Sequence, residues 1–197
     1  MGIYLNPGSD KFQEALRSAI YVDKSGMIAY TNRIFKSSNK YICVSRPRRF
    51  DKSMAANMLS AYYDRTVDGS MVFRGLAIAG NADFDTYRNQ CDVLFLNMQE
   101  FLSQTNSMED MLALVRRSVL WDIYMAYSDY MYFDKQNLSR TMADVYMQSE
   151  RPFVIIIDEW DCIFREYRND YQAQRQYLDF LRDWLKDKAY IGLAYMT

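Results

Sequence analysis

Residues 151–161 read RPFVIIIDEWD, an unbroken apolar run that ends in two adjacent carboxylates. Such a run, bounded by polar residues, is typical of a strand buried on both faces of a parallel sheet. Ligands of open α/β sheets bind at the carboxyl ends of the strands, where Asp158 and Glu159 are expected to lie. The Asp-Glu ending is the layout of a Walker B motif, in which the Asp holds magnesium and the Glu activates the attacking water. The alternative is an acidic turn after a core strand.

A second stretch, KYICVSRPRRFDKSMAANML at residues 40–59, has the order strand, loop and helix that a phosphate-binding P-loop requires. Lys52 and Ser53 fill the last two places of the pattern G-x-x-x-x-G-K-S/T, so Lys52 is expected to bind phosphate and Ser53 to ligate Mg²⁺. Both glycines of the pattern are replaced, by Arg46 and Asp51. A solvated basic loop is therefore the alternative for this stretch alone. Together and in this order, the two motifs predict a P-loop NTPase fold.

The pattern along the whole chain predicts an α/β fold with a mainly parallel sheet. The expected strands are residues 41–44, 93–96, 153–157 and 190–194, and none alternates cleanly between apolar and polar residues. Helices are expected at residues 10–19, 23–35, 51–64, 107–127, 139–147 and 171–189, and an irregular segment at residues 64–89. Because there is no internal repeat or low-complexity linker, we expect residues 1–197 to form one domain with residues 1–40 as a helical lead-in.

Composition excludes several kinds of chemistry. The chain contains no histidine, which removes Ser-His-Asp and Cys-His nucleophiles and His-ligated zinc. Cys43, Cys91 and Cys162 form no C-x-x-C pair, so we expect free thiols in a reducing compartment, with the cytoplasm as the default location. The net charge of −1 gives no long-range attraction to nucleic acid or anionic lipid, and no apolar run is long enough to cross a bilayer.

Other features have ordinary structural interpretations. The tyrosine pair at residues 62 and 63 and the aromatic stretch at residues 126–133 are expected to be core or rim residues rather than base-stacking platforms. Trp160 and Asp161 are expected to pack and cap locally, and Cys162 to be a buried thiol rather than a nucleophile. A basic cluster, made of Arg46, Arg48, Arg49 and Lys52, leaves nucleic-acid backbone binding open as a second class of function.

Four ordered stretches, YVDKSGMI (residues 21–28), SRPRRFDKSM (45–54), FVIIIDEWD (153–161) and YIGLAYMT (190–197), resemble the bacterial AAA-ATPase-like family. The resemblance runs from about Tyr4 to Thr197 and implies a three-layer P-loop NTPase sandwich that uses ATP and Mg²⁺. It also implies that arginine is normal at the first glycine position. When the roles of the family's motif positions are carried over to this sequence, the expected nucleotide-binding residues are Arg46, Pro47, Arg48, Arg49, Phe50, Asp51, Lys52, Ser53, Met54 and Thr197. Ser53 and Asp158 are the metal residues, Glu159 and Lys52 the catalytic ones, and Thr197 the sensor of the γ phosphate.

The resemblance also carries an expectation about the end of the chain. Family members usually continue with the rest of the ATPase and a nuclease-like domain of the PD-(D/E)XK type, so the chain is expected to be C-terminally truncated. Any nucleic-acid binding by the family's nuclease-like part would then lie outside residues 1–197. The sheet order of this NTPase branch is commonly 5-1-4-3-2, with the fifth strand after Thr197. Without that strand, residues 41–44 are expected to form an exposed apolar edge that favours self-association, which light scattering would detect.

Asp51 is a departure from the family, which has glycine beside the lysine. A carboxylate about 4 Å from a phosphate costs on the order of 4 kcal/mol at an effective dielectric constant of about 20, roughly a thousandfold in affinity. We therefore expect a degenerate Walker A loop that binds Mg-ATP weakly if at all, and ATP hydrolase activity only if the site is functional. The alternative is a nucleotide-dead fragment that serves as a protein-interaction or basic-loop nucleic-acid-binding module, with a protein partner or a second copy of the chain.

Overall fold

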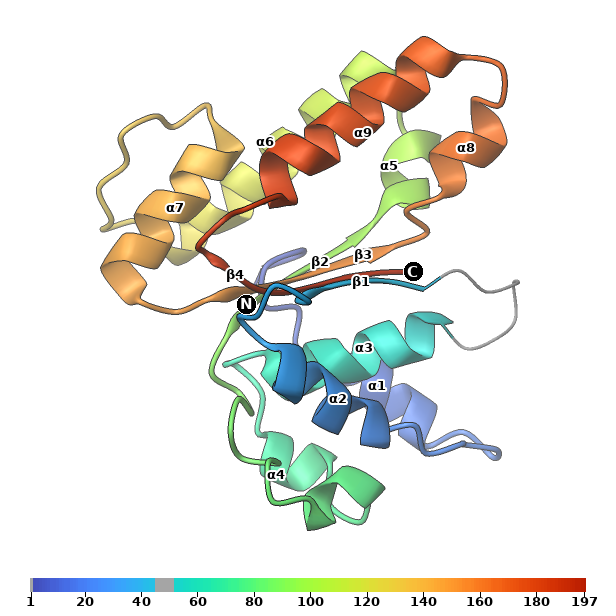
Figure 1. Cartoon of the computed structure of the whole chain (residues 1–197), viewed down its shortest axis with the longest axis vertical. Helices are drawn as coiled ribbons and strands as arrows, with labels where there is room; N and C mark the ends of the chain where they lie inside the picture. The colour runs from blue at the N-terminus through green and yellow to red at the C-terminus, as the bar shows by residue number, and fades with distance from the viewer. Residues whose placement is uncertain (1, 45–51) are drawn as a thin grey trace.

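A computed structural model describes residues 2–44 and 52–197. Within these residues, four strands form an all-parallel sheet: β1 (Tyr41–Cys43), β2 (Asp92–Asn97), β3 (Phe153–Asp158) and β4 (Ile191–Met196). Their spatial order is β1-β4-β3-β2 (Figure 1), which is the expected order of the first four strands. The predicted α/β class with a parallel sheet is confirmed, and the arrangement is compatible with a P-loop-like fold.

Helices cover both faces of the sheet, so that the molecule has three layers (Figure 1). One face carries α1 (Asp10–Leu16), α2 (Gly26–Ile34), α3 (Lys52–Tyr63), α4 (Gly69–Val72) and a short 3-10 helix (Ala77–Gly80). The other face carries α5 (Met98–Ser103), α6 (Met108–Ala126), α7 (Leu138–Ser149), α8 (Cys162–Glu166) and α9 (Tyr171–Leu185). No helix in the described ranges combines the length and the apolar character that crossing a membrane needs.

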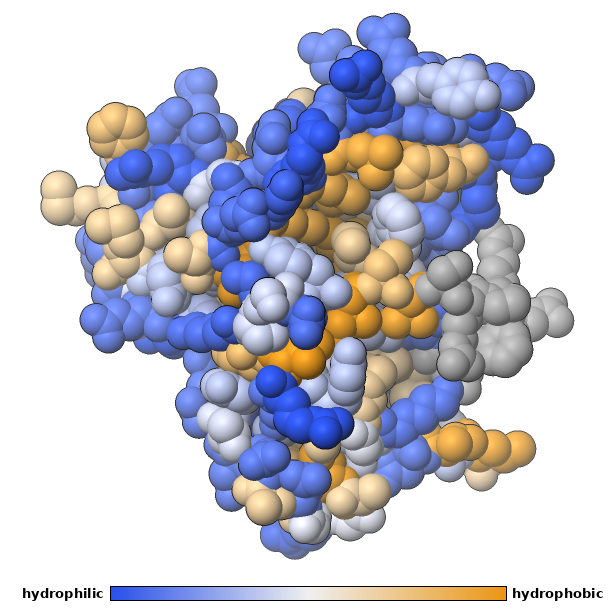
Figure 2. Space-filling view, in the orientation of Figure 1, coloured by the Kyte–Doolittle hydropathy of each residue, from blue (hydrophilic) through white to orange (hydrophobic). Residues whose placement is uncertain are grey.

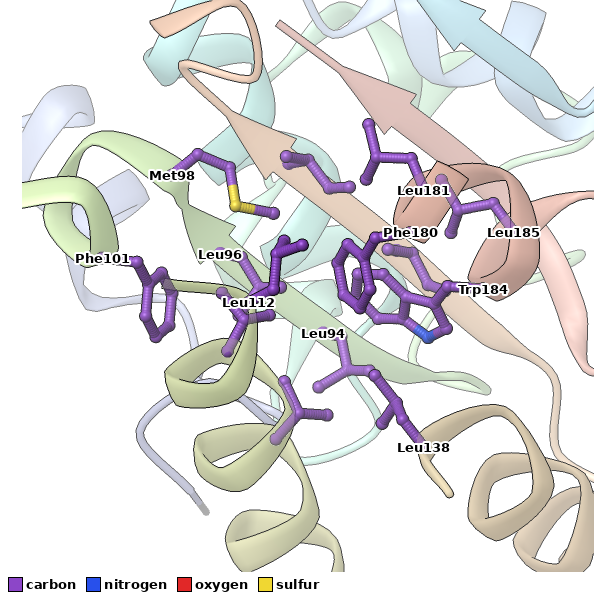
Figure 3. Packing of buried hydrophobic residues seen from close by; sticks show 14 of the residues in the cluster. Leu94, Leu96, Met98, Phe101, Leu112, Leu138, Phe180, Leu181, Trp184 and Leu185 are labelled. Carbon is purple, nitrogen blue, oxygen red and sulfur yellow. The ribbon is translucent and has the colours of Figure 1, made fainter. Parts of the chain in front are cut away.

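Side chains of the central strands alternate between two hydrophobic cores. Along β3, Phe153, Ile155 and Ile157 join the core under α5 to α9, whereas Val154 and Ile156 join the core under α1 to α4. Figure 3 shows the first of these cores, in which Leu94 and Leu96 of β2 pack with residues of α5, α6 and α9. Because both faces of the strand are buried, both sets of side chains are apolar. This explains why the strand sequences do not alternate in polarity.

Strand β1 lies at an edge of the sheet, as the family's sheet order implied, although its apolar sequence by itself favoured a strand covered on both faces. Tyr41 and Cys43 are exposed, and within residues 2–44 and 52–197 β1 pairs along one side only, with β4. Apolar surface gathers at the level of the sheet, where β1 runs between the two helical layers (Figures 1 and 2). The prediction of self-association at this edge stays a prediction.

The other edge of the sheet is covered by the N-terminal segment. Leu5 pairs antiparallel with Leu94 of β2, and the flanking bonds are Asn6 N to Val93 O at 2.7 Å and Phe95 N to Tyr4 O at 2.9 Å. The residues before α1 therefore contribute a short pairing to the sheet, which the sequence did not indicate.

Most predicted helices are present with shifted ends. Ser107 caps α6 as expected, since its hydroxyl accepts from the amide of Asp110. α2 begins at Gly26 rather than at Asp23, because the Asp23 carboxylate accepts from Ser25 N and Ala77 N at 2.8 and 2.7 Å. Helices α4, α5 and α8 were not predicted, since four to six residues are too short to show a helical period.

The tyrosine pair and the cysteines, which were given ordinary interpretations, lie where expected. Tyr62 and Tyr63 are fully buried in the core under α1 to α4. The three cysteines are free, with Cys91 and Cys162 buried and Cys43 exposed. Burial raises the pKa of the Cys162 thiol to about 12, which fits a buried thiol rather than a nucleophile.

Candidate functional site

The candidate site lies at the carboxyl edge of the sheet, where β2, β3 and β4 end at Asn97, Asp158 and Met196. Asn97 stands opposite Asp158 in the register of β2 and β3. Thr197 follows β4 and donates its amide to the carbonyl of Ile157 at 2.9 Å, so it lies beside the end of β3. The sheet thus brings together chain segments that are about 40 to 60 residues apart in the sequence.

A cavity of about 330 Å³ lies at this edge. Ser53, in the first turn of α3, and Asp158, the last residue of β3, both line it. The remaining lining residues are Ile3, Tyr4, Lys11, Asn57, Phe95, Asn97 and Glu100. The N-terminus of α3, a helix of 12 residues, places the positive end of the helix dipole at this edge. Such an end is suited to bind an anion such as phosphate.

Asp158 is held between groups of opposite charge. Its side chain is nearly fully buried, and its Oδ1 accepts from the amide of Glu159 at 3.0 Å. Burial raises the pKa of Asp158, the Glu159 charge raises it further, and the Ser53 hydroxyl, the Glu159 amide and the Lys52 ammonium lower it. The influence of Lys52 and Ser53 on this carboxyl group means that the two sequence motifs meet at one edge of the sheet.

Glu159 points elsewhere. It is not among the residues that line the cavity, and its Oε2 accepts from Nη2 of Arg165 at 2.5 Å. Its φ of +51° lies in the left-handed region, which non-glycine residues seldom occupy and which is often found at functional sites. The expected role of Glu159 as general base stays a prediction.

Thr197 and Met54 also lie outside the cavity lining. Thr197 is fully buried, and its side chain lies close enough to the Tyr195 hydroxyl to lower the pKa of that group. Met54 packs partly buried against the core under α1 to α4. A direct contact of either residue with nucleotide stays a prediction.

The predicted loop residues Arg46, Pro47, Arg48, Arg49, Phe50 and Asp51 lie outside the described residues. The expectation of an altered Walker A loop therefore rests on the sequence alone. The described part of the motif consists of Lys52, Ser53 and Met54, which begin α3.

The residues at this edge fit a magnesium ion better than a metal bound wholly by protein. Mg²⁺ prefers hard oxygen ligands and usually takes one or two carboxylates together with waters and substrate phosphates. Asp158 offers a carboxylate and Ser53 a hydroxyl in the same cavity. Among the described residues, no group of three or more acidic, histidine or cysteine side chains could hold a metal ion by itself. A metal here would need the phosphates of a bound nucleotide to complete its ligands.

Sequence reasoning missed several residues of the cavity, including Lys11, Asn57, Asn97 and Glu100. Asn97 could have been found, because it follows the apolar run at residues 93–96 as Asp158 follows the run at 153–157. Lys11 could not, because nothing in its neighbourhood indicates that the N-terminal segment lies beside α3.

Comparison with known protein families gives a match over most of the chain. The model of a family described as predicted AAA-ATPase (AAA-ATPase-like) matches residues 8–192. No curated protein and no solved structure matches the chain.

Proposed function

The chain belongs to the AAA-ATPase-like family, which is described as a predicted AAA-ATPase, and we propose that the cavity at the carboxyl edge of its sheet is an Mg-ATP site. One observation carries this proposal above the others. Ser53 at the start of α3 and Asp158 at the end of β3 line the same cavity, and the Lys52 charge acts on Asp158. A P-loop NTPase needs a hydroxyl, a carboxylate and an ammonium group together at this place.

Each residue has a role that follows from its chemistry. The Lys52 ammonium binds phosphate oxygens, and the free amides at the start of α3 add hydrogen bonds to them. The Ser53 hydroxyl and the Asp158 carboxylate hold the metal, directly or through water. Mg²⁺, when bound, would neutralise the charge of the phosphate oxygens. Glu159 accepts a proton from the attacking water, and Thr197 hydrogen-bonds the terminal phosphate.

We propose that Asp51 weakens this site. Its carboxylate adjoins Lys52 in the sequence, at the position where the P-loop pattern has a glycine. Its repulsion of phosphate opposes the attraction of Lys52 and of the neighbouring arginines. A weak ATPase with an altered Walker A loop is the expected result.

Isothermal titration of the natural chain and of Asp51→Gly with Mg-ATP tests the proposal. Equal micromolar binding by both forms would show that the carboxylate is tolerated. Binding only by the variant would show that the site is intact but disabled by Asp51. If neither form gives a binding signal, the result contradicts the nucleotide site and favours the interaction module as the function.

A further inference from the structure

Arg165 of α8 forms a fork around the turn that follows β3. Its Nη2 donates to Oε2 of Glu159 at 2.5 Å, and its Nη1 donates to Oδ1 of Asp161 at 2.5 Å. The side chains of Arg165 and Glu159 are each 27% exposed, so the ion pair is shielded in part from water. Two charge-assisted bonds from one planar guanidinium fix a geometry more firmly than a single lysine contact does.

The backbone holds Glu159 in the same direction. The left-handed conformation of Glu159 is fixed by two flanking bonds, from Trp160 N to Thr197 O at 3.2 Å and from Cys162 N to Glu159 O at 3.1 Å. The side chain therefore leaves the strand end toward α8 because of both the turn and the ion pair.

Asp158 and Glu159 are thus directed to opposite faces of the sheet. Asp158 shares a cavity with Ser53 of α3, whereas Arg165 belongs to α8, which covers the other face (Figure 1). A general base has to come within hydrogen-bond reach of the water it activates. With its Oε2 bonded to Arg165 and its side chain outside the cavity lining, Glu159 does not meet that condition in this conformation.

We propose that Arg165 is a positioning residue that clamps Glu159 away from the nucleotide cavity, so that hydrolysis requires the ion pair to open. The inference rests on the proposed function, because it concerns the base of that same site. A ligand or partner that engages Arg165 or Asp161 would release Glu159 and activate the site. The clamp sets the fraction of molecules in which the base can reach the attacking water, and it leaves nucleotide binding by Lys52, Ser53 and Asp158 unchanged.

Arg165→Gln tests the clamp, since it removes the charge and keeps a side chain of similar polarity. Arg168→Gln is the matched control, because Arg168 is exposed and lies three residues further along the chain, after the end of α8. ATP hydrolysis is measured as kcat and KM, and Mg-ATP affinity by titration, in the natural chain and in the Asp51→Gly background. Hydrogen exchange of residues 158–162 without nucleotide gives a readout that does not depend on activity.

We expect Arg165→Gln to raise kcat about 2- to 5-fold with KM and affinity unchanged, which is the range of a partly exposed ion pair. Exchange in the turn should accelerate in the same variant. Arg168→Gln should behave as the natural chain, Arg165→Lys should lie between them, and Glu159→Gln should abolish the gain when combined with Arg165→Gln.

The outcomes separate the clamp from the proposed function. Nucleotide binding with a kcat that is unchanged or lowered in Arg165→Gln and Arg165→Lys overturns the clamp and leaves the nucleotide site standing. Absence of binding in every form, the Asp51→Gly background included, overturns the proposed function and the clamp with it.

Discussion

Asp92→Asn should destabilise the fold strongly while leaving the candidate site untouched. Asp92 begins β2, at the opposite end from Asn97, and its side chain is completely buried. Its Oδ1 accepts from Asn6 Nδ2 at 2.8 Å and from Arg65 Nε at 2.7 Å. Its Oδ2 accepts from the Tyr127 hydroxyl and from Arg151 Nε at 3.4 Å. This one carboxylate therefore ties the N-terminal segment, the end of α3, the end of α6 and the start of β3.

The expected loss can be worked from these contacts. The hydrogen bonds that Asp92 accepts from Arg65 and Arg151 are bonds between charged groups, which contribute about 1.5–3 kcal/mol each. Breaking a buried ion pair by removing one partner costs about 3–5 kcal/mol. The side chains of Arg65 and Arg151 are 32% and 36% exposed, so water compensates part of the loss. We expect about 3 kcal/mol, which corresponds to a fall in Tm of roughly 6–12 °C for a chain of this size.

Urea unfolding followed by circular dichroism measures this loss. Asp85→Asn is the matched control, because the Asp85 side chain is 75% exposed in its ion pair with Arg88. This substitution should lower the free energy of unfolding by less than about 1 kcal/mol. Mg-ATP affinity of the folded variant should equal that of the natural chain. A loss for Asp92→Asn as small as that of the control would refute the view that this carboxylate ties the fold together.

Two further predictions concern stability. Burial, and then the charge of Asp92, raises the pKa of Tyr127 from 10 to about 12, so its stabilising contribution is complete below pH 10 and is lost as the pH rises to 12. Tyr127→Phe should therefore reduce the slope of stability against pH in that window by about 1.4 kcal/mol per pH unit, and an unchanged slope in urea titrations would contradict this. Gly192→Ala should cost roughly 1–3 kcal/mol, because the added Cβ would lie 2.3 Å from the ring of Phe35. Gly80→Ala is its control, since nothing lies within 4 Å of that Cβ, and equal stability of the two variants would count against the packing argument.

The sequence predicted the parts of the fold whose signal is strong over a long or wholly apolar stretch. β3 begins at Phe153 as expected, and α6 begins one residue after its predicted cap, Ser107. The same reasoning did not find α8, whose five residues span little more than one turn. For residues 41–44 the apolar pattern favoured a strand covered on both faces, because composition reports burial and not place in the sheet, whereas the sheet order implied by the family resemblance put this strand at an edge, where β1 lies.

The sequence indicated that the segments of Ser53 and Asp158 meet at one edge of the sheet, but it did not indicate the directions of the two acidic side chains. The adjacent positions of Asp158 and Glu159 in the motif indicated that the two residues act together. The left-handed backbone of Glu159 and its ion pair with Arg165 direct the two side chains apart. A motif records which residues follow one another, and the direction of each side chain depends on φ, ψ and tertiary partners that the motif does not contain. Asp161 bonds Arg165 rather than capping α8 with its side chain, for the same reason.

The most direct test of the account is the dependence of nucleotide binding on Asp158. Mg-ATP is titrated calorimetrically into Asp51→Gly and into the same chain carrying Asp158→Asn, with EDTA present in a parallel experiment. We expect micromolar binding by the first chain, at least a tenfold loss with Asp158→Asn, and a loss of similar size when the metal is removed. Binding of equal strength in both chains, or binding that does not respond to EDTA, would contradict it.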